Sequence, residues 1–213
     1  VDTITTGSDG VASSKELYLG KYEIQEITAP HGMVLNGTIQ TVELTYAGQE
    51  VAITETAGNL YNERQKVKIS LSKVLEQNEL FGIGMNGELK NIIFGLYAKT
   101  DLVADDGTVI PAGGLIEIVT FDDNGMATVS ADLPLGSYYM QERSTDEHYI
   151  LDDTHYEFEF SYGSQETHMV EISVNGGDPI KNDLKYGMIS GRKVDEDGHV
   201  IAGAIFGLLR NDE

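Results

Sequence analysis

Apolar and polar residues alternate along several short segments of this chain. Residues 156–162 read Tyr-Glu-Phe-Glu-Phe-Ser-Tyr, so every second side chain can face a core. Successive side chains of a β-strand point to opposite faces, and the pattern therefore predicts a strand with one buried face. The same reasoning predicts strands at residues 42–46, 67–74, 92–98, 115–121, 126–130, 136–143 and 169–174.

Turn-forming sequences separate these segments, for example Asp-Asn-Gly at 123–125 and Asn-Gly-Gly at 175–177. Only residues 72–80 have a spacing that would also suit a short helix. Many short strands joined by such turns are typical of β-sandwiches. We therefore expect an all-β fold made of antiparallel, immunoglobulin-like sandwiches.

The same pattern returns at a long spacing. The segment Leu-Gly-Lys-Tyr-Glu-Ile-Gln-Glu at 19–26 matches Leu-Gly-Ser-Tyr-Tyr-Met-Gln-Glu at 135–142, which lies 116 positions later. Asn62 is followed by Asn182, and Lys73 by Lys193, both after 120 positions. A spacing near 120 residues is too long for a solenoid repeat and suits one whole domain.

This repeat predicts three parts. Residues 1–65 would be the C-terminal part of a first domain, 66–183 a complete domain, and 184–213 the N-terminal part of a third. On this division we expect the chain to be a piece of a longer array. The junctions at 62–66 and 182–186 are short, so consecutive domains would form a stiff rod with little swivel.

The composition argues against several classes of function. The chain carries 35 acidic and 14 basic residues, a formal net charge of −21, so we expect no nucleic-acid partner and no contact with anionic membranes. It has no cysteine, which excludes disulfides, zinc–thiolate sites and cysteine nucleophiles. No apolar run is long enough to predict a membrane span.

The polar motifs outside the repeat indicate neither a cofactor nor an enzyme. The acidic turns at 122–124 and 195–198 lack the spacing of a calcium-binding loop. The five histidines show no metal-binding spacing, and no nucleophile-elbow sequence is present. We expect no cofactor, no metal and no enzymatic turnover.

Three polar residues are predicted to face the core. Every second residue of the strand at 67–74 is apolar until Lys73, which therefore points inward with them. Glu142 lies on the apolar face of the strand at 136–143, and Asn182 lies on the apolar side of its own segment. The repeated lysine, asparagine and glutamate are thus the candidate functional residues.

Burying a lone lysine or carboxylate costs several kcal/mol unless the group is paired or neutralised. From the residues alone, three explanations remain open. The side chains could form a buried Lys–Glu salt bridge capped by the asparagine. They could instead lie in water at the ends of the sandwich, or they could react with one another.

Three motifs occur together in this order: an inward lysine on the first strand, Ile-Phe-Gly-Leu (93–96 and 205–208), and Leu-Gly-x-Tyr-x-x-x-Glu (19–26 and 135–142). Their combination resembles the Cna B-type domains, the prealbumin-like, SpaA-type modules of Gram-positive surface adhesins and pilins. The Ala-Pro-His-Gly-Met sequence that closely follows Glu26 resembles that family's Pro-x-Gly-Tyr loop. The complete domain departs from the pattern, with Thr-Asp-Glu-His at 145–148 and a longer insertion at 75–91.

The resemblance implies tandem prealbumin-like sandwiches, each with an intramolecular isopeptide bond between a lysine and an asparagine. Carried over by position, Lys73 would be the nucleophile, Asn182 the electrophile, and Glu142 the buried acid whose proton hydrogen-bonds the asparagine carbonyl. Burial favours the neutral amine and the protonated acid, and the fold holds the reacting atoms in contact. One ammonia leaves, and the reaction occurs once.

The first and third parts carry incomplete copies of this site. Glu26 and Asn62 occupy the glutamate and asparagine positions, and Lys193 occupies the lysine position. Because the two parts together contain one set, the third part of one molecule could dock on the first part of another.

A cross-link between the outermost strands would strengthen a domain that has no disulfide. We therefore predict a structural stalk segment of a cell-wall-anchored surface adhesin or pilin, extracellular and attached through a region outside this sequence. Its expected partners are neighbouring repeats of the same protein. The alternative is an adhesive module that binds a host matrix protein or a glycan directly.

Overall fold

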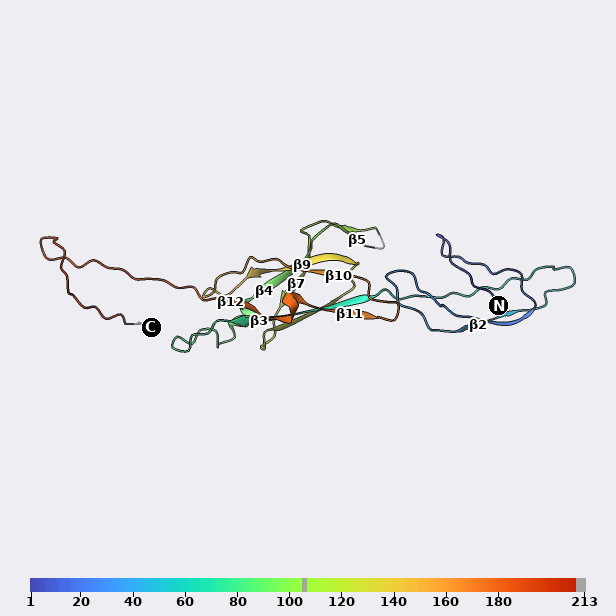
Figure 1. The fold of residues 1–213 in the computed structure, drawn as a ribbon, viewed down its shortest axis with the longest axis horizontal. Helices are drawn as coiled ribbons and strands as arrows, with labels where there is room; N and C mark the ends of the chain where they lie inside the picture. Colours follow the sequence, from blue (N-terminus) through green and yellow to red (C-terminus); the bar gives the residue numbers. More distant parts are fainter. Residues whose placement is uncertain (105–106, 210–213) are drawn as a thin grey trace.

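The described residues extend along one axis in three regions (Figure 1). A computed structural model describes residues 1–104 and 107–209, so the last four residues of the predicted third domain lie outside it. A two-sheet unit occupies the middle, with an N-terminal region at one end and an extended C-terminal segment at the other. None of the described residues belongs to a helix that is long and apolar enough to cross a membrane.

Two four-stranded sheets form the central unit. The first sheet contains, in spatial order, β10 (Tyr156–Phe160), β9 (Gly136–Ser144), β4 (Ile93–Ala98) and β7 (Leu115–Thr120). In the second sheet, β3 (Lys66–Leu75) is central, with β8 (Met126–Ala131) on one side and, on the other, β11 (Met169–Ser173) followed along the same edge by β12 (Ile180–Asn182).

The remaining elements are small. They are the N-terminal pair β1 (Gly20–Ile24) and β2 (Gln40–Leu44), the pair β5 (Leu102–Val103) and β6 (Val109–Ile110), and the short 3-10 turns η1 (Glu88–Asn91) and η2 (Val174–Gly177). The turn η2 separates β11 from β12, and Asn175 enters the left-handed region there with φ of 56°. The predicted Asn-Gly-Gly turn thus lets one edge of the sheet continue along β3 as two strands.

The all-β sandwich is confirmed, and two details differ from the sequence prediction. Strand β3 pairs in parallel with β11 and β12, whereas the other strand pairs among the described residues are antiparallel. The helix considered at 72–80 is wrong, because β3 continues to Leu75. The alternation that places Lys73 on the inner face extends the strand through this segment.

The facing sheets enclose one apolar core. Side chains with no exposed surface include those of Val67, Ile69, Phe94, Leu96 and Met140. Complete burial of each such side chain contributes about 1.5–3 kcal/mol to folding. Only four polar side chains among those the structure describes are buried, and the three predicted site residues are among them.

The N-terminal region repeats part of the central unit. Strands β1 and β2 pair with Gly20 opposite Leu44, and β9 and β10 pair with Gly136 opposite Phe160, so both registers differ by the same 116 positions. The hydroxyl of Tyr22 donates to the Tyr18 carbonyl at 2.6 Å. Tyr138 makes the corresponding bond one repeat later, to the carbonyl of residue 134.

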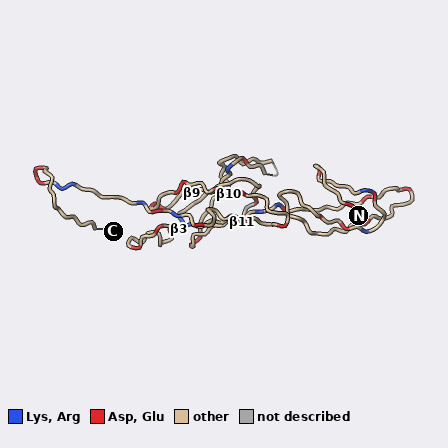
Figure 2. Tube along the Cα trace, in the orientation of Figure 1, with Lys and Arg blue, Asp and Glu red and all other residues tan. Residues whose placement is uncertain are grey.

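Residues 186–209 form no strand in the structure. Their one regular feature is an isolated antiparallel bridge between Val194 and Val200. Their side chains are exposed, including Ile189 and Phe206, and acidic and basic residues are interspersed along the trace (Figure 2). The division at 184–213 therefore stays a prediction.

A buried glutamine joins the N-terminal region to the central unit. The Gln65 side chain is 2% exposed. Its Nε2 donates to the carbonyls of Ser164 at 3.2 Å and Thr167 at 2.7 Å, and its Oε1 accepts from the Gly163 amide at 2.9 Å. The glutamine thus fastens the start of β3 to the loop after β10.

The same loop also contacts the N-terminal region directly. Gln165 accepts from the Ala29 amide through its side chain at 3.0 Å and from the Leu35 amide through its carbonyl at 2.8 Å. The rings of His31 and Tyr162 lie 4.6 Å apart between centroids. These contacts restrict swivel at the first junction.

Replacing Gln65 with alanine should loosen this junction. The substitution leaves the Gly163 amide and two carbonyls without their partner, and each buried group left unpaired costs about 1–3 kcal/mol. We expect faster amide hydrogen exchange at Gly163. Lys66→Ala, which removes an exposed neighbouring side chain, should leave that exchange unchanged. Equal exchange rates in the two variants would contradict the role assigned to Gln65.

Candidate functional site

Three strands bring the predicted residues together. Lys73 lies on the inner face of β3, Glu142 on the inner face of β9 in the opposite sheet, and Asn182 at the end of β12. Parallel pairing places Ile180 beside Lys73, so Asn182 lies just beyond the lysine along the sheet edge. Lys73 and Glu142 have fully buried side chains, and Asn182 is 1% exposed.

The lysine amine lies against the asparagine amide. Lys73 Nζ donates a hydrogen bond to Asn182 Oδ1, and its separation from Glu142 Oε1 is 3.8 Å. Asn182 Nδ2 lies 3.0 Å from both carboxylate oxygens of Glu142. The amide therefore sits between the amine and the carboxylate.

Burial lowers the pKa of Lys73 below its usual value of 10.5, because the apolar surroundings disfavour the charged amine. The negative charges of Glu142 and Asp152 oppose this shift without reversing it. The Phe94 ring, 5.4 Å from Nζ to its centroid, forms part of the apolar wall. The site thus favours a neutral amine more than water does.

This geometry narrows the three explanations left by the sequence. Burial removes the possibility of side chains solvated at the sandwich ends. Lys73 and Glu142 form a buried salt bridge, with 3.8 Å between Nζ and Oε1, and the amide of Asn182 lies between the two groups, so the salt-bridge explanation also fits the site. The contact of the amine with the amide is the arrangement that a reaction between them needs.

The orientation of the amide differs from the prediction. We expected Glu142 to hydrogen-bond the carbonyl of Asn182, but that carbonyl faces Lys73 and the carboxylate faces Nδ2. The amine lies on the acceptor side of the amide because it donates its hydrogen bond to Asn182 Oδ1. The carboxylate consequently lies next to the nitrogen that would leave in a condensation.

Three further residues hold the amide and the acid, and none of them was predicted from the sequence. Asn182 Nδ2 lies 2.9 Å from Thr145 Oγ1 and 3.1 Å from the Ile150 carbonyl. The Asp152 amide donates to Glu142 Oε2 at 2.8 Å. The departure from the family pattern at 145–148 was visible in the sequence, but backbone groups brought in by folding leave no sequence signal.

Gly125 shapes the turn beside the lysine. Its φ is +72°, and a Cβ there would collide with the Lys73 carbonyl oxygen. The Lys73 amide donates to the Gly125 carbonyl at 2.7 Å. The predicted Asp-Asn-Gly turn therefore fixes the lysine backbone through a close contact that a larger residue cannot make.

A second, incomplete site lies in the N-terminal region. Glu26 Oε2 accepts from Asn62 Nδ2 at 2.6 Å and from the Asn36 amide at 2.7 Å, and Asn62 Nδ2 also donates to the Val34 carbonyl at 2.8 Å. Each contact has its counterpart in the central unit, at Glu142, Asn182, Asp152 and Ile150. Ala29 stands in the position of Thr145, so the hydroxyl contact is missing.

Lys193 does not reach this incomplete site. It lies in the exposed C-terminal segment, at the opposite end of the molecule from β1 and β2 (Figure 1). Its carbonyl accepts from the Ile201 amide at 3.0 Å. The structure therefore assembles one complete set of the three residues and leaves the other divided.

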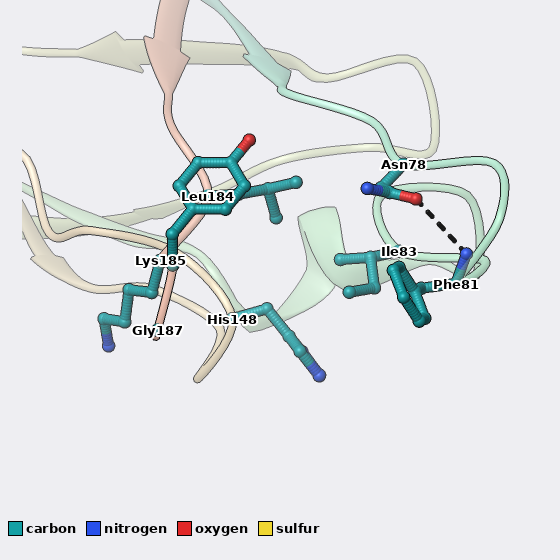
Figure 3. A pocket seen from close by; sticks show the side chains of 8 residues that line it. Asn78, Phe81, Ile83, His148, Leu184, Lys185 and Gly187 are labelled. Atoms are coloured by element: carbon teal, nitrogen blue, oxygen red, sulfur yellow. Dashed lines mark hydrogen bonds between the residues drawn. The ribbon is translucent and has the colours of Figure 1, made fainter. Parts of the chain in front are cut away.

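A pocket lies between the insertion after β3 and the second junction (Figure 3). Phe81 and Leu184 contribute apolar surface, and His148 and Lys185 contribute polar groups. Asn78 shapes the loop by accepting a hydrogen bond from the Phe81 amide at 3.3 Å. None of the three site residues lines this pocket, which is a feature of the junction.

Solved structures share the fold. The chain is similar to the Bacillus anthracis TIE protein, with 22% identity over 85% of this chain and a TM-score of 0.54. The chain is also similar to the D312A variant of BcpA, the major pilin subunit of Bacillus cereus, with 21% identity, a TM-score of 0.32, and coverage of 55% of this chain and 29% of that one. Similarity to the group B streptococcus pilus 2b backbone protein has 17% identity, a TM-score of 0.38, and coverage of 68% of this chain and 48% of that one. The fold comparison rests on the first of these. This chain covers only 28% of that protein's length.

No curated protein matches the sequence. The SpaA prealbumin-like fold domain family matches it over residues 1–57 and 83–176, which is more than half of the chain. The matched ranges contain Glu26 and Glu142 and leave out Lys73 and Asn182. Two separate matches agree with the repeat of strand registers described above. The chain belongs to the SpaA family of prealbumin-like fold domains.

Proposed function

We propose that this chain is a structural stalk segment of a Gram-positive surface adhesin or pilin, stabilised by a self-formed bond between Lys73 and Asn182. One observation carries the proposal: the amine and the amide meet, fully buried, beside Glu142. Such a bond forms once and converts no substrate, so its benefit is to strengthen the protein that carries it. This is the benefit expected in a structural protein. The protein is accordingly not an enzyme in the ordinary sense.

The reaction follows from the positions of the three side chains. Neutral Lys73 Nζ attacks the Asn182 side-chain carbonyl carbon and forms a new C–N bond. Glu142 accepts a proton from the attacking nitrogen and delivers it to Nδ2, which lies 3.0 Å from its oxygens, and the C–Nδ2 bond then breaks. Ammonia is the leaving group, and the carboxylate ends in the state in which it began.

The fold accelerates the reaction because it holds the amine and the amide in contact before they react. Reacting groups held in contact by a folded scaffold can lower a barrier by about 7–11 kcal/mol relative to free reactants. The product would close a loop across 109 positions. By the chain-entropy relation for disulfides, a loop of that size stabilises the fold by about 4.7 kcal/mol.

A surface location and pilin-like partners follow from the proposed role. Neighbouring repeats of the same protein are the expected partners, with cell-wall attachment through another region. Direct adhesion to a matrix protein or glycan is less well supported. The aromatic cluster of Tyr97, Tyr139 and His155 on the outer sheet face consists of rings stacked at 4.9 and 4.3 Å, and stacked rings cover the faces that a sugar would use.

Intact-protein mass spectrometry tests the bond. The 213-residue chain should weigh less than its sequence by one ammonia. Lys73→Ala, Glu142→Ala and Asn182→Ala should each restore the full mass, because each removes a required participant. Lys68→Ala should keep the deficit, since Lys68 lies on the same strand, points outward and pairs with Glu171 at the surface. A full mass in the unaltered chain would refute the proposal.

The rate of bond formation should rise with pH and level off below pH 10.5. Only the neutral amine reacts, so the rate follows its fraction, which grows tenfold per pH unit until the folded-state pKa is reached. Burial lowers that pKa from 10.5, so the plateau begins earlier than for a solvated lysine.

The measurement uses chemically synthesised chain that is kept unfolded in a denaturant. Dilution into buffers of different pH starts folding, and the mass is recorded over time. Lys73→Ala reports the folding rate without the bond. A rate that continues to rise past pH 10.5 would show that the amine is not desolvated when it reacts.

A further inference from the structure

We infer that Asp152 is a positioning residue of the cross-linking site, and that its negative charge sets the pH at which the Lys73–Asn182 bond forms. This role depends on the reaction proposed above and adds a control on when that reaction occurs. Asp152 lies in the segment between β9 and β10, and this segment acts on every member of the site.

Two backbone groups of this segment contact the site. The Ile150 carbonyl accepts a hydrogen bond from Asn182 Nδ2 at 3.1 Å. The Asp152 amide donates to Glu142 Oε2 at 2.8 Å. The other oxygen of Glu142, Oε1, lies 3.8 Å from Lys73 Nζ. A single hydrogen bond therefore connects Asp152 to the acid that faces the amine.

These backbone contacts do not require a carboxylate at position 152. In the N-terminal region Asn36 stands in the position of Asp152, and its amide donates to Glu26 Oε2 at 2.7 Å. Asn36 Oδ1 accepts from the Thr38 amide at 2.9 Å, and Asp152 Oδ1 accepts in the same way from the Thr154 amide at 3.0 Å. An asparagine thus forms the same turn and holds the acid with the same bond. What the aspartate adds is a negative charge.

Neighbouring groups keep this charge in place. Asp152 Oδ2 accepts from the Tyr156 hydroxyl at 2.6 Å, while Oδ1 accepts from the Thr154 amide. Burial acts to raise the pKa of the Asp152 carboxyl, but these hydrogen bonds outweigh it and hold the pKa below its usual value of 3.8. Burial and the bond to Asp152 raise the pKa of the Tyr156 phenol above its usual value of 10.0, so the phenol remains a donor. Asp152 is therefore ionised in neutral and alkaline buffers.

Among the residues that the structure describes, two negative charges act on the Lys73 amine. They belong to Glu142 and Asp152, and both oppose the lowering of the pKa of Lys73 by burial. The other groups around the site are the neutral phenol of Tyr156 on β10 and the apolar ring of Phe94 on β4. Asp152 therefore favours the ammonium form of Lys73, which is the form that cannot attack the amide.

The charge of Asp152 consequently affects folding and reaction in opposite directions. Moving an ammonium into an apolar core is costly unless opposite charge compensates it, and Asp152 supplies part of that compensation while the two sheets pack. The ammonium must then release its proton to solvent before Lys73 Nζ attacks Asn182. Because a nearby negative charge disfavours this release, Asp152 makes the lysine easier to bury and slower to react at a given pH.

Asp152→Asn tests this role, because asparagine can form the turn seen at Asn36 and carries no charge. The 213-residue chain is refolded at about pH 5, where the amine is charged, and is then transferred to buffers of higher pH. Mass spectrometry follows the loss of ammonia over time. The rate should reach half its maximum at a lower pH in Asp152→Asn than in the unaltered chain, with the same plateau. A displacement of this midpoint by one pH unit would raise the rate below it tenfold.

Asp153→Asn is the matched control. It removes one negative charge from the neighbouring residue, whose side chain is exposed, and should leave the midpoint unchanged. A purely structural role for Asp152 would lower the plateau of Asp152→Asn without moving its midpoint, and that result would overturn the inference. Equal midpoints in all three chains, or an equal displacement in both variants, would overturn it as well.

Asp152→Ser is a second uncharged variant, whose hydroxyl can also accept from the Thr154 amide. If the unaltered chain loses ammonia but neither Asp152→Asn nor Asp152→Ser does so at any pH, the side chain is required for more than the timing of the reaction. The inference then fails while the Lys73–Asn182 proposal stands. If the unaltered chain keeps its full mass, both fail.

Discussion

The structure depends on holding a lysine amine away from water inside an apolar sandwich. A charged ammonium in that position costs several kcal/mol unless acceptors or opposite charge compensate. Lys73 has both, in Asn182 and Glu142, and each comes from a different strand. The amine can be accommodated only when β3, β9 and β12 are packed in one register. Fold and site are therefore the same constraint, because the strands that define the sandwich also assemble the three side chains.

Much of this arrangement could be predicted from the period-2 pattern. Alternation along β3 placed Lys73 on the core face, and alternation along β9 placed Glu142 on the same face as the apolar residues of that strand. The long-range repeat identified which polar residues belong together. The repeat is informative because corresponding residues occupy the same places on corresponding strands. The strand pairs β1–β2 and β9–β10 have matching registers, which shows this correspondence directly.

Other features could not be predicted because they depend on contacts between distant segments. The parallel pairing of β3 with β12 requires the chain ends of the unit to meet, which alternation does not encode. The Ile150 carbonyl and the Asp152 amide contact the site through backbone groups that every residue possesses. The helix considered at 72–80 was wrong because the local spacing of apolar residues suited both a helix and a strand. In the structure the strand β3 continues to Leu75, with Lys73 on its buried face.

The position of the proposed bond determines how the unit would respond to pulling. Force applied along the molecule would enter the unit at the start of β3, directly after Gln65, and would leave it after β12. A bond from Lys73 to Asn182 would carry the force between them and bypass the chain in between, which spans 109 positions. Unravelled, that stretch would lengthen the molecule by about 360–390 Å at the reach of an extended chain. The loaded part of β3 is already extended, so it has little length to release. A bond between these two residues would therefore remove nearly all extensibility from the unit.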